Sequence, residues 1–166
     1  WEPFYQRLLA EADQHCAPAY LYDVFSVAEL PEIVRWLPKD AAAVALALCT
    51  LGDQIEVRIG DVAQHDLVSA VILDEIALAL ITAFTRQIHA SIGNYPCARG
   101  LKAGPAYRPG VGRWPLETQR TVFARLPARD IGVTLNEQLW MTPAKSTSLI
   151  IPLLDRNQSR RIGSGQ

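Results

Sequence analysis

The most specific segment of this chain is Tyr107-Arg108-Pro109-Gly110-Val111-Gly112-Arg113-Trp114-Pro115-Leu116-Glu117. Its two glycines allow a sharp turn and a close approach of the backbone N–H groups to a ligand, because glycine has no Cβ. Pro115 suits the first position of a helix, where a missing N–H group costs nothing. With Arg108 and Arg113 beside it, the turn is either a cradle for a polar or anionic group or a connecting loop with charged flanks.

Charge is distributed unevenly along the chain. Residues 1–85 carry 4 Lys/Arg and 13 Asp/Glu, a balance of −9, whereas residues 86–166 carry 12 and 4, a balance of +8. The basic residues near the turn are Arg99, Lys102, Arg108, Arg113, Arg120, Arg125 and Arg129. Such asymmetry either holds the two halves together or attracts an acidic partner or anionic ligand. Nucleic acid is not expected, since aromatic residues do not alternate with the basic ones.

Length and composition favour a single domain. The chain has 166 residues, which suits one core spanning residues 1–155. Residues 156–166 lack apolar periodicity and are predicted to form a mobile tail. Asp74-Glu75 interrupts the longest apolar run, residues 67–84, so the run predicts a buried helix and not a membrane span. No signal peptide is visible, and a cytoplasmic protein is expected.

The pattern of apolar residues predicts an α+β fold with a mixed or antiparallel sheet. Helices are predicted at residues 3–16, 31–37, 66–92 and 115–126, the last with Leu116, Phe123 and Leu126 inward. Strands are predicted at residues 19–27, 41–50, 131–135, 138–141 and 146–153. Residues 54–60 alternate as a strand does, but a helix remains open.

The long helix is predicted to begin at the N-cap Asp66 and to stop at Gly93. It is apolar on most faces, so it should be the central buried element. Residues 93–115 are predicted to be a long loop, a type that is often functional.

Three segments together resemble the activation domain of vitamin B12-dependent methionine synthase and its stand-alone relatives. They are Thr50-Leu51-Gly52-Asp53-Gln54-Ile55-Glu56, Val71-Ile72-Leu73-Asp74, and the block from Pro109 to Arg120 with its continuations at residues 131–137 and 141–148. The likeness covers residues 42–153. The resemblance implies an activation-domain fold with a long buried helix against the sheet.

The resemblance also implies a function. The domain would bind S-adenosylmethionine and support reductive remethylation of a corrinoid methyltransferase, with the cobalamin held by a partner. Its partner would be a corrinoid protein or methyltransferase. The implied ligand-binding residues are Arg108, Pro109, Gly110, Val111, Gly112, Trp114, Lys145 and Ser146.

The family pattern is not complete in this chain. The family's motif arginine falls at Ala106, its tyrosine at Val111, and an acid of its long helix at Thr82. A carboxylate–guanidinium grip is directional, and alanine or threonine cannot replace it. Arg108 lies two residues from the expected position and is the candidate substitute. The alternative function is a non-catalytic assembly or docking subunit of a methyltransferase complex that has lost the ligand site.

Neither catalytic nor metal-ligating residues are expected. The histidines His15, His65 and His89 are scattered, and no carboxylate or cysteine spacing makes them ligands. Three widely spaced cysteines, with no C-x-x-C pair, indicate neither a zinc site nor a disulfide framework. Asp74 and Glu75 point about 100° apart on a helix, so they are not assigned acid–base chemistry. His89 is predicted to be a partly buried structural histidine.

Overall fold

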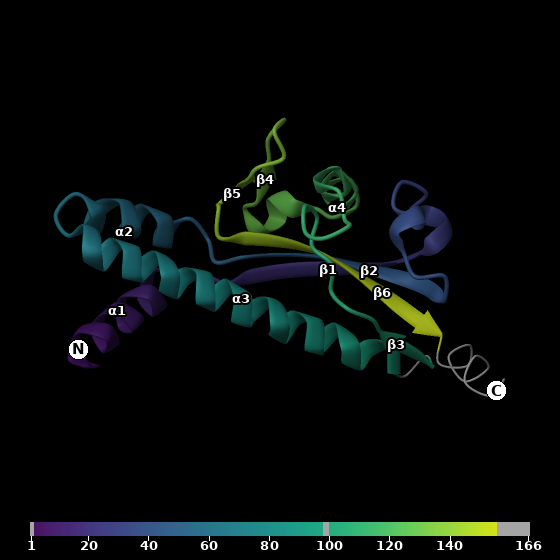
Figure 1. The fold of residues 1–166 in the computed structure, drawn as a ribbon, viewed down its shortest axis with the longest axis horizontal. Helices are drawn as coiled ribbons and strands as arrows, with labels where there is room; N and C mark the ends of the chain where they lie inside the picture. The colour runs from purple at the N-terminus through teal and green to yellow at the C-terminus, as the bar shows by residue number, and fades with distance from the viewer. Residues whose placement is uncertain (1, 98–99, 156–166) are drawn as a thin grey trace. The chain divides into compact units, whose positions relative to one another are not determined.

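The computed structural model describes residues 2–97 and 100–155 and has an α+β architecture (Figure 1). The α-helices are α1 (Glu2–His15), α2 (Gln54–Ala63), α3 (Leu67–Cys97) and α4 (Gln119–Arg125). Short 3-10 helices are η1 (Val27–Glu29), η2 (Val34–Trp36), η3 (Leu116–Thr118) and η4 (Ala128–Ile131). The strands are β1 (Ala19–Ser26), β2 (Ala41–Thr50), β3 (Leu101–Ala103), β4 (Thr134–Leu135), β5 (Met141–Thr142) and β6 (Ser146–Asp155).

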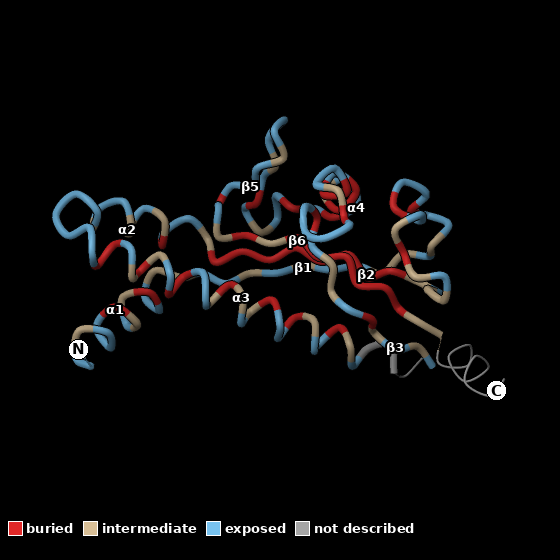
Figure 2. The backbone as a smooth tube through the Cα atoms, viewed as in Figure 1, coloured by how far each residue is buried: buried red, intermediate tan, exposed pale blue. Residues whose placement is uncertain are grey.

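Four strands form the main sheet, in the order β1-β2-β6-β3. β3 pairs antiparallel with β6, with Leu101 opposite Asp155 and Ala103 opposite Leu153. The two inner strands are the most apolar, and residues 44–50 of β2 and 148–153 of β6 are all buried (Figure 2). β4 and β5 form a separate antiparallel pair. The predicted α+β class with an antiparallel sheet and a long helix is confirmed.

The packing of the Cα trace divides the chain into two compact units. The first unit comprises Trp1–Tyr20, Cys49–Arg86 and Ala128–Thr147, and the second comprises Leu21–Leu48, Gln87–Pro127 and Ser148–Gln166. The single domain expected over residues 1–155 stays a prediction. The tail expected at 156–166 lies outside the described residues.

Helix α3 begins where the sequence predicts and ends later. The Asp66 carboxylate accepts the Ser69 N–H at 3.0 Å and the Ser69 hydroxyl at 2.6 Å, which caps the helix. These bonds stabilise the charged carboxylate and lower the pKa of Asp66. The expected stop at Gly93 is wrong, since α3 continues to Cys97. A Cβ at Gly93 would lie 3.8 Å from the Ala103 Cβ, an ordinary van der Waals contact with β3.

The prediction that α3 is the central buried element holds for one side of the helix only. Buried positions recur along one side of the helix, and exposed positions occupy the other (Figure 2). In its most apolar window of 18 residues, 33% of the residues are buried. By length and composition this helix could cross a membrane, but the core helices of soluble proteins can be equally long and apolar.

Several other local predictions change. Residues 54–60, left open between strand and helix, are part of α2. Residues 93–115 contain the end of α3 and the whole of β3, so they are not an unstructured loop. Residues 31–37 contain only the 3-10 turn η2. Of the strands expected at residues 131–135 and 138–141, the structure has β4 within the first and only the first residue of β5, Met141, within the second. After Pro115, Leu116 is exposed and Phe123 is half-buried, whereas Val122 and Leu126 are buried.

Candidate functional site

The turn of residues 107–114 lies in the second unit and is fixed to β6 at its start. Tyr107 and Ile150 form an antiparallel bridge in which each N–H donates to the other's carbonyl at 2.9 Å. Three residues earlier, the Gly104 N–H donates to the Pro152 carbonyl at 2.7 Å. A Cβ at Gly104 would lie 3.2 Å from that carbonyl, which explains the glycine. The nearby His89 Nε2 forms a hydrogen bond with Gly104 O at 2.8 Å, as a partly buried structural histidine would.

Hydrogen bonds inside the turn occupy two of the N–H groups that the sequence predicted to face a ligand. The Gly110 N–H donates to Trp114 O at 2.9 Å, and the Val111 N–H donates to Arg108 O at 3.1 Å. Gly110 and Gly112 have φ of 82° and 62°, a conformation that glycine adopts without strain. Within the described part of the chain, the Gly112 N–H has no hydrogen-bond partner. It is therefore a donor that the turn itself does not use.

Trp114 holds the turn from inside the unit. Its side chain is 2% exposed, and its ring stacks on Tyr107 with centroids 4.9 Å apart and an interplanar angle of 27°. The indole Nε1 is buried without a hydrogen-bond partner among the described residues. Pro109 is buried as well, whereas Val111 is 61% exposed. A ligand would therefore meet the turn at its exposed residues, with Trp114 and Pro109 fixing its shape.

The arginines of the second unit have different surroundings. Arg108 is exposed, and its guanidinium has no partner among residues 2–97 and 100–155. Arg113 donates from Nη2 to the Trp36 carbonyl at 3.1 Å. Arg125 donates to the Glu29 carbonyl at 2.6 Å. Arg108 is thus a cation next to the turn whose five guanidinium donors are not used within the described residues.

Lys145 and Ser146 belong to the first unit, and both are engaged there. The Lys145 Nζ lies 2.7 Å from Asp74 Oδ1, and the Lys145 N–H donates to Glu56 Oε1 at 2.8 Å. The Ser146 hydroxyl donates to Thr50 Oγ1 at 2.9 Å and is buried. In this structure both residues fasten the start of β6 to the end of β2 and to α3. Their predicted role in ligand binding stays a prediction.

Sequence reasoning missed the two acids that hold Lys145. Asp74 lies 71 residues away and Glu56 lies 89 residues away. Both acids lie in segments that carry the family resemblance. That resemblance was the signal in the sequence that could have pointed to them. Thr82, the position aligned with the family's helix acid, donates its hydroxyl to Leu78 O at 2.8 Å. Ala106 is half-buried and supplies no charge.

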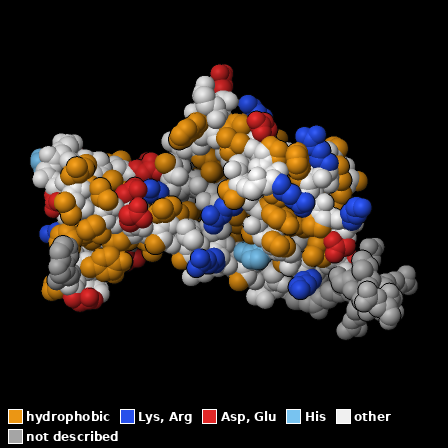
Figure 3. All heavy atoms as spheres, viewed as in Figure 1, with side chains coloured by type: hydrophobic (Ala, Val, Ile, Leu, Met, Phe, Trp, Pro, Cys, Tyr) orange, Lys and Arg blue, Asp and Glu red, His pale blue; other side chains and the backbone are white. Residues whose placement is uncertain are grey.

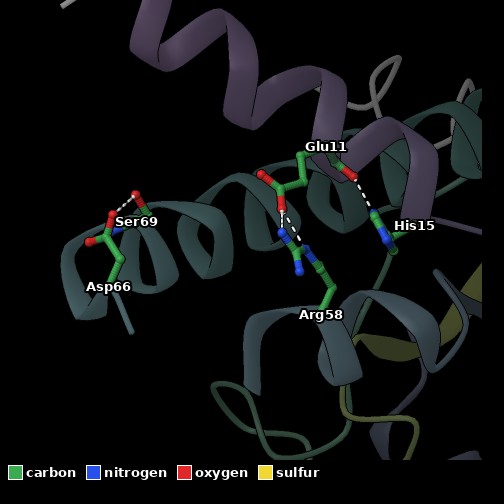
Figure 4. Close-up of polar contacts among 5 residues, drawn as sticks. All are labelled: Glu11, His15, Arg58, Asp66 and Ser69. Atoms are coloured by element: carbon green, nitrogen blue, oxygen red, sulfur yellow. Dashed lines mark hydrogen bonds and ion pairs between the residues drawn. The ribbon is translucent and has the colours of Figure 1, made fainter. Parts of the chain in front are cut away.

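A cavity of about 460 Å³ lies in the first unit between α1, α2 and the start of α3. Arg58 of α2 makes an ion pair with Glu11 of α1, and His15 Nδ1 donates to the Glu11 carbonyl at 2.8 Å (Figure 4). Asp66 and Ser69 pair with each other at another part of the wall. These polar groups form hydrogen bonds and an ion pair with one another, so we interpret the cavity as space left between packed helices.

The described residues offer no cluster for a metal ion. Among them, no group of three or more His, Cys, Asp or Glu side chains is placed to hold one.

Burial, with the nearby Asp13 carboxylate as a lesser cause, raises the pKa of the Cys16 thiol. Cys49 is buried, and its thiol donates to Thr147 O at 3.6 Å. A raised pKa lowers the thiolate fraction, so Cys16 is a poor nucleophile.

Comparison with solved structures defines the fold. The chain is similar to the crystal structure of the MetH reactivation domain bound to AdoHcy, with a TM-score of 0.66 and 16% sequence identity. The match covers 95% of this chain and 72% of that chain. No protein-family model matches the sequence, and no curated protein matches it either. The fold that the sequence resemblance predicted, that of the methionine synthase reactivation domain, is therefore confirmed.

Proposed function

We propose that this chain is a methionine synthase activation-domain-like protein that binds S-adenosylmethionine and supports reductive remethylation of a corrinoid methyltransferase in the cytoplasm. The observation that carries the proposal is the shared fold, because the similar domain was crystallised with AdoHcy. S-adenosylmethionine would supply the methyl group, and the cobalt of a corrinoid held by a partner would accept it. The chain itself would orient the ligand and dock to the partner.

Arg108 and the Gly112 N–H are the groups proposed to hold the amino-acid end of the ligand. A carboxylate fits this arrangement, since the exposed guanidinium and the N–H group have no partner within the described residues. Charge-assisted bonds from arginine to a carboxylate are shorter and about twice as strong as neutral ones. Arg108 would thus take the role that the family gives to an arginine two residues earlier.

A second candidate is a docking subunit that keeps the fold and has lost the ligand site. Ala106 and Val111 stand where the family has its motif arginine and tyrosine. In addition, the N–H groups of Gly110 and Val111 are used within the turn. These observations favour a chain whose remaining role is assembly.

Calorimetric titration separates the two candidates. The purified chain is titrated with S-adenosylmethionine and, separately, with AdoHcy. Micromolar affinity, about −8 kcal/mol, with a loss of about tenfold or more in Arg108→Ala supports ligand binding by the turn. Arg129→Ala is the matched control, because Arg129 is an exposed arginine of the first unit. No heat at millimolar ligand would refute the binding proposal and favour the docking subunit. Equal affinities of the two variants would refute the role of Arg108.

A further inference from the structure

Helix α3 carries an exposed apolar stripe in the first unit. Leu67, Val68, Val71 and Leu78 are 68%, 63%, 55% and 49% exposed. Leu67, Val71 and Leu78 follow helical spacing along one face, and at 1.5 Å per residue they span about 16 Å. Asp74 lies on this face between Val71 and Leu78. Exposed apolar side chains gathered on one helix face, unlike singly scattered ones, mark interaction sites.

A hollow lies at the beginning of this stripe. Its volume is about 240 Å³, and its walls come from α2 and α3. The apolar lining includes Ile59, Ala63, Leu67 and Val71, and the ionisable lining consists of Asp74 and Glu75. Pockets that receive one bulky apolar side chain at the centre of a surface are typical anchor points of protein interfaces. We call the stripe together with its hollow the α2–α3 face.

The charge at the α2–α3 face that has no partner among the described residues is negative. Glu75 is exposed and has no partner in the described part of the chain, while Asp74 is paired with Lys145. The first unit as a whole carries 11 Asp/Glu against 5 Lys/Arg, a balance of −6. Hydrophobic and acidic side chains, with basic side chains beside them, are interspersed over α2 and the first turns of α3 (Figure 3). A surface of this composition attracts an apolar partner with a basic rim.

The same charges disfavour two other occupants. A membrane leaflet with anionic lipids would be repelled by Glu75 and by the net charge of the unit. A second copy placed by a two-fold axis would bring each acidic α2–α3 face against an identical one. Neither objection applies to a positively charged protein segment.

We infer that the α2–α3 face is a docking site for an amphipathic helix of a partner protein, with apolar residues seated on the stripe and Lys or Arg residues beside Glu75. Helices that bind in this mode place anchors at i, i+3, i+4 and i+7 in an apolar groove. The inference goes beyond ligand binding by the turn, and it stands whether or not S-adenosylmethionine binds. It assigns the partner contact to a defined surface of the first unit.

Binding of two designed peptides, measured by fluorescence anisotropy, tests the inference. Both are labelled short helices with leucine at i, i+3, i+4 and i+7; one has lysines beside the apolar face, and the other has glutamates at the same positions. The lysine peptide is expected to bind at least about tenfold more tightly, with an affinity that falls as salt rises. Glu75→Lys is expected to reverse the preference. Val71→Asp is expected to abolish binding of both peptides.

The control variant is Trp140→Asp, which removes another exposed apolar side chain of the same unit, 73% exposed between β4 and β5. It is expected to bind like the unaltered chain, and circular dichroism checks that each variant is folded. Equal binding of both peptides, no binding at millimolar peptide, or equal losses in the Val71 and Trp140 variants would overturn the inference. Concentration-dependent dimerisation that Val71→Asp abolishes would overturn it in favour of a second copy. Binding to anionic lipid vesicles that Val71→Asp abolishes would overturn it in favour of a membrane.

Discussion

Replacing Trp114 with alanine is expected to lower the free energy of unfolding by about 3 kcal/mol. The side chain is 2% exposed, and removal of a buried aromatic ring typically costs about 3–5 kcal/mol. Loss of the stacked pair with Tyr107 adds about 0.5–1.5 kcal/mol. An opposite contribution of about 1–3 kcal/mol comes from removing the indole N–H, which is buried without an acceptor among the described residues.

Phenylalanine at the same position separates these contributions. Trp114→Phe keeps a ring for stacking and removes only the unpartnered Nε1 along with part of the ring volume. The penalty of the smaller ring and the gain from deleting the N–H nearly cancel, so the expected change is within about 1 kcal/mol. The alanine and phenylalanine variants should therefore differ by about 2 kcal/mol or more.

Urea unfolding followed by far-ultraviolet circular dichroism measures both changes. Trp140→Ala is the matched control, since the Trp140 side chain is 73% exposed and its loss should cost less than about 0.5 kcal/mol. A cost below about 1 kcal/mol for Trp114→Ala would refute the idea that this ring holds the turn. If Trp114→Phe were as costly as Trp114→Ala, the indole N–H would have a hydrogen-bond partner after all.

Three further predictions concern the turn, the Lys145 contact and the helix cap. Gly110→Ala should lower the free energy of unfolding, measured in urea, more than Gly112→Ala does. Each substitution costs about 1 kcal/mol, because alanine is strained at positive φ. A Cβ at Gly110 would in addition lie 3.1 Å from the Leu116 side chain. Asp74→Asn should cost about 1 kcal/mol, and less in 1 M NaCl, because it leaves Lys145 unpaired; no salt dependence would contradict an ionic contact. The pKa of Asp66 is lowered in the folded state, so its stabilising effect is complete above the unfolded value of about 3.9 and is lost as pH falls through the folded value. In Asp66→Asn the helical circular dichroism signal should fall less steeply with pH over that acid range than in the unaltered chain. Identical acid titration curves for the two proteins would count against the cap.

The sequence predicts the regular elements best where local chemistry and tertiary packing agree. Residues 41–50 form β2 within the predicted bounds, because a run that is apolar at successive positions suits a strand buried on both faces. The cap at Asp66 is equally local. Gly93 misled the prediction, because a glycine within a helix usually weakens it by about 1 kcal/mol. Here the helix continues through Gly93, and a Cβ at that position would make only an ordinary contact with Ala103, at 3.8 Å.

The candidate site was predictable in part. The two positive-φ glycines follow from the sequence, since this spacing favours a tight turn. The use of the Gly110 N–H within the turn does not follow from the sequence, because it depends on where the Trp114 carbonyl lies in the folded turn. The contact between Lys145 and Asp74 joins residues 71 positions apart, and no local pattern encodes it.

The apolar faces of α3 show why burial is harder to predict than secondary structure. The pattern correctly predicts a long helix, because an apolar run of this length after a capping aspartate is too long for a strand. Apolarity indicates that a side chain favours removal from water, but it does not specify which atoms will cover it. Leu73 and Ile81 are covered by this chain, whereas Leu67 and Val71 are left in solvent. An apolar position that its own fold leaves uncovered, beside an acid without a partner among the described residues, is therefore the observation on which the proposed docking site rests.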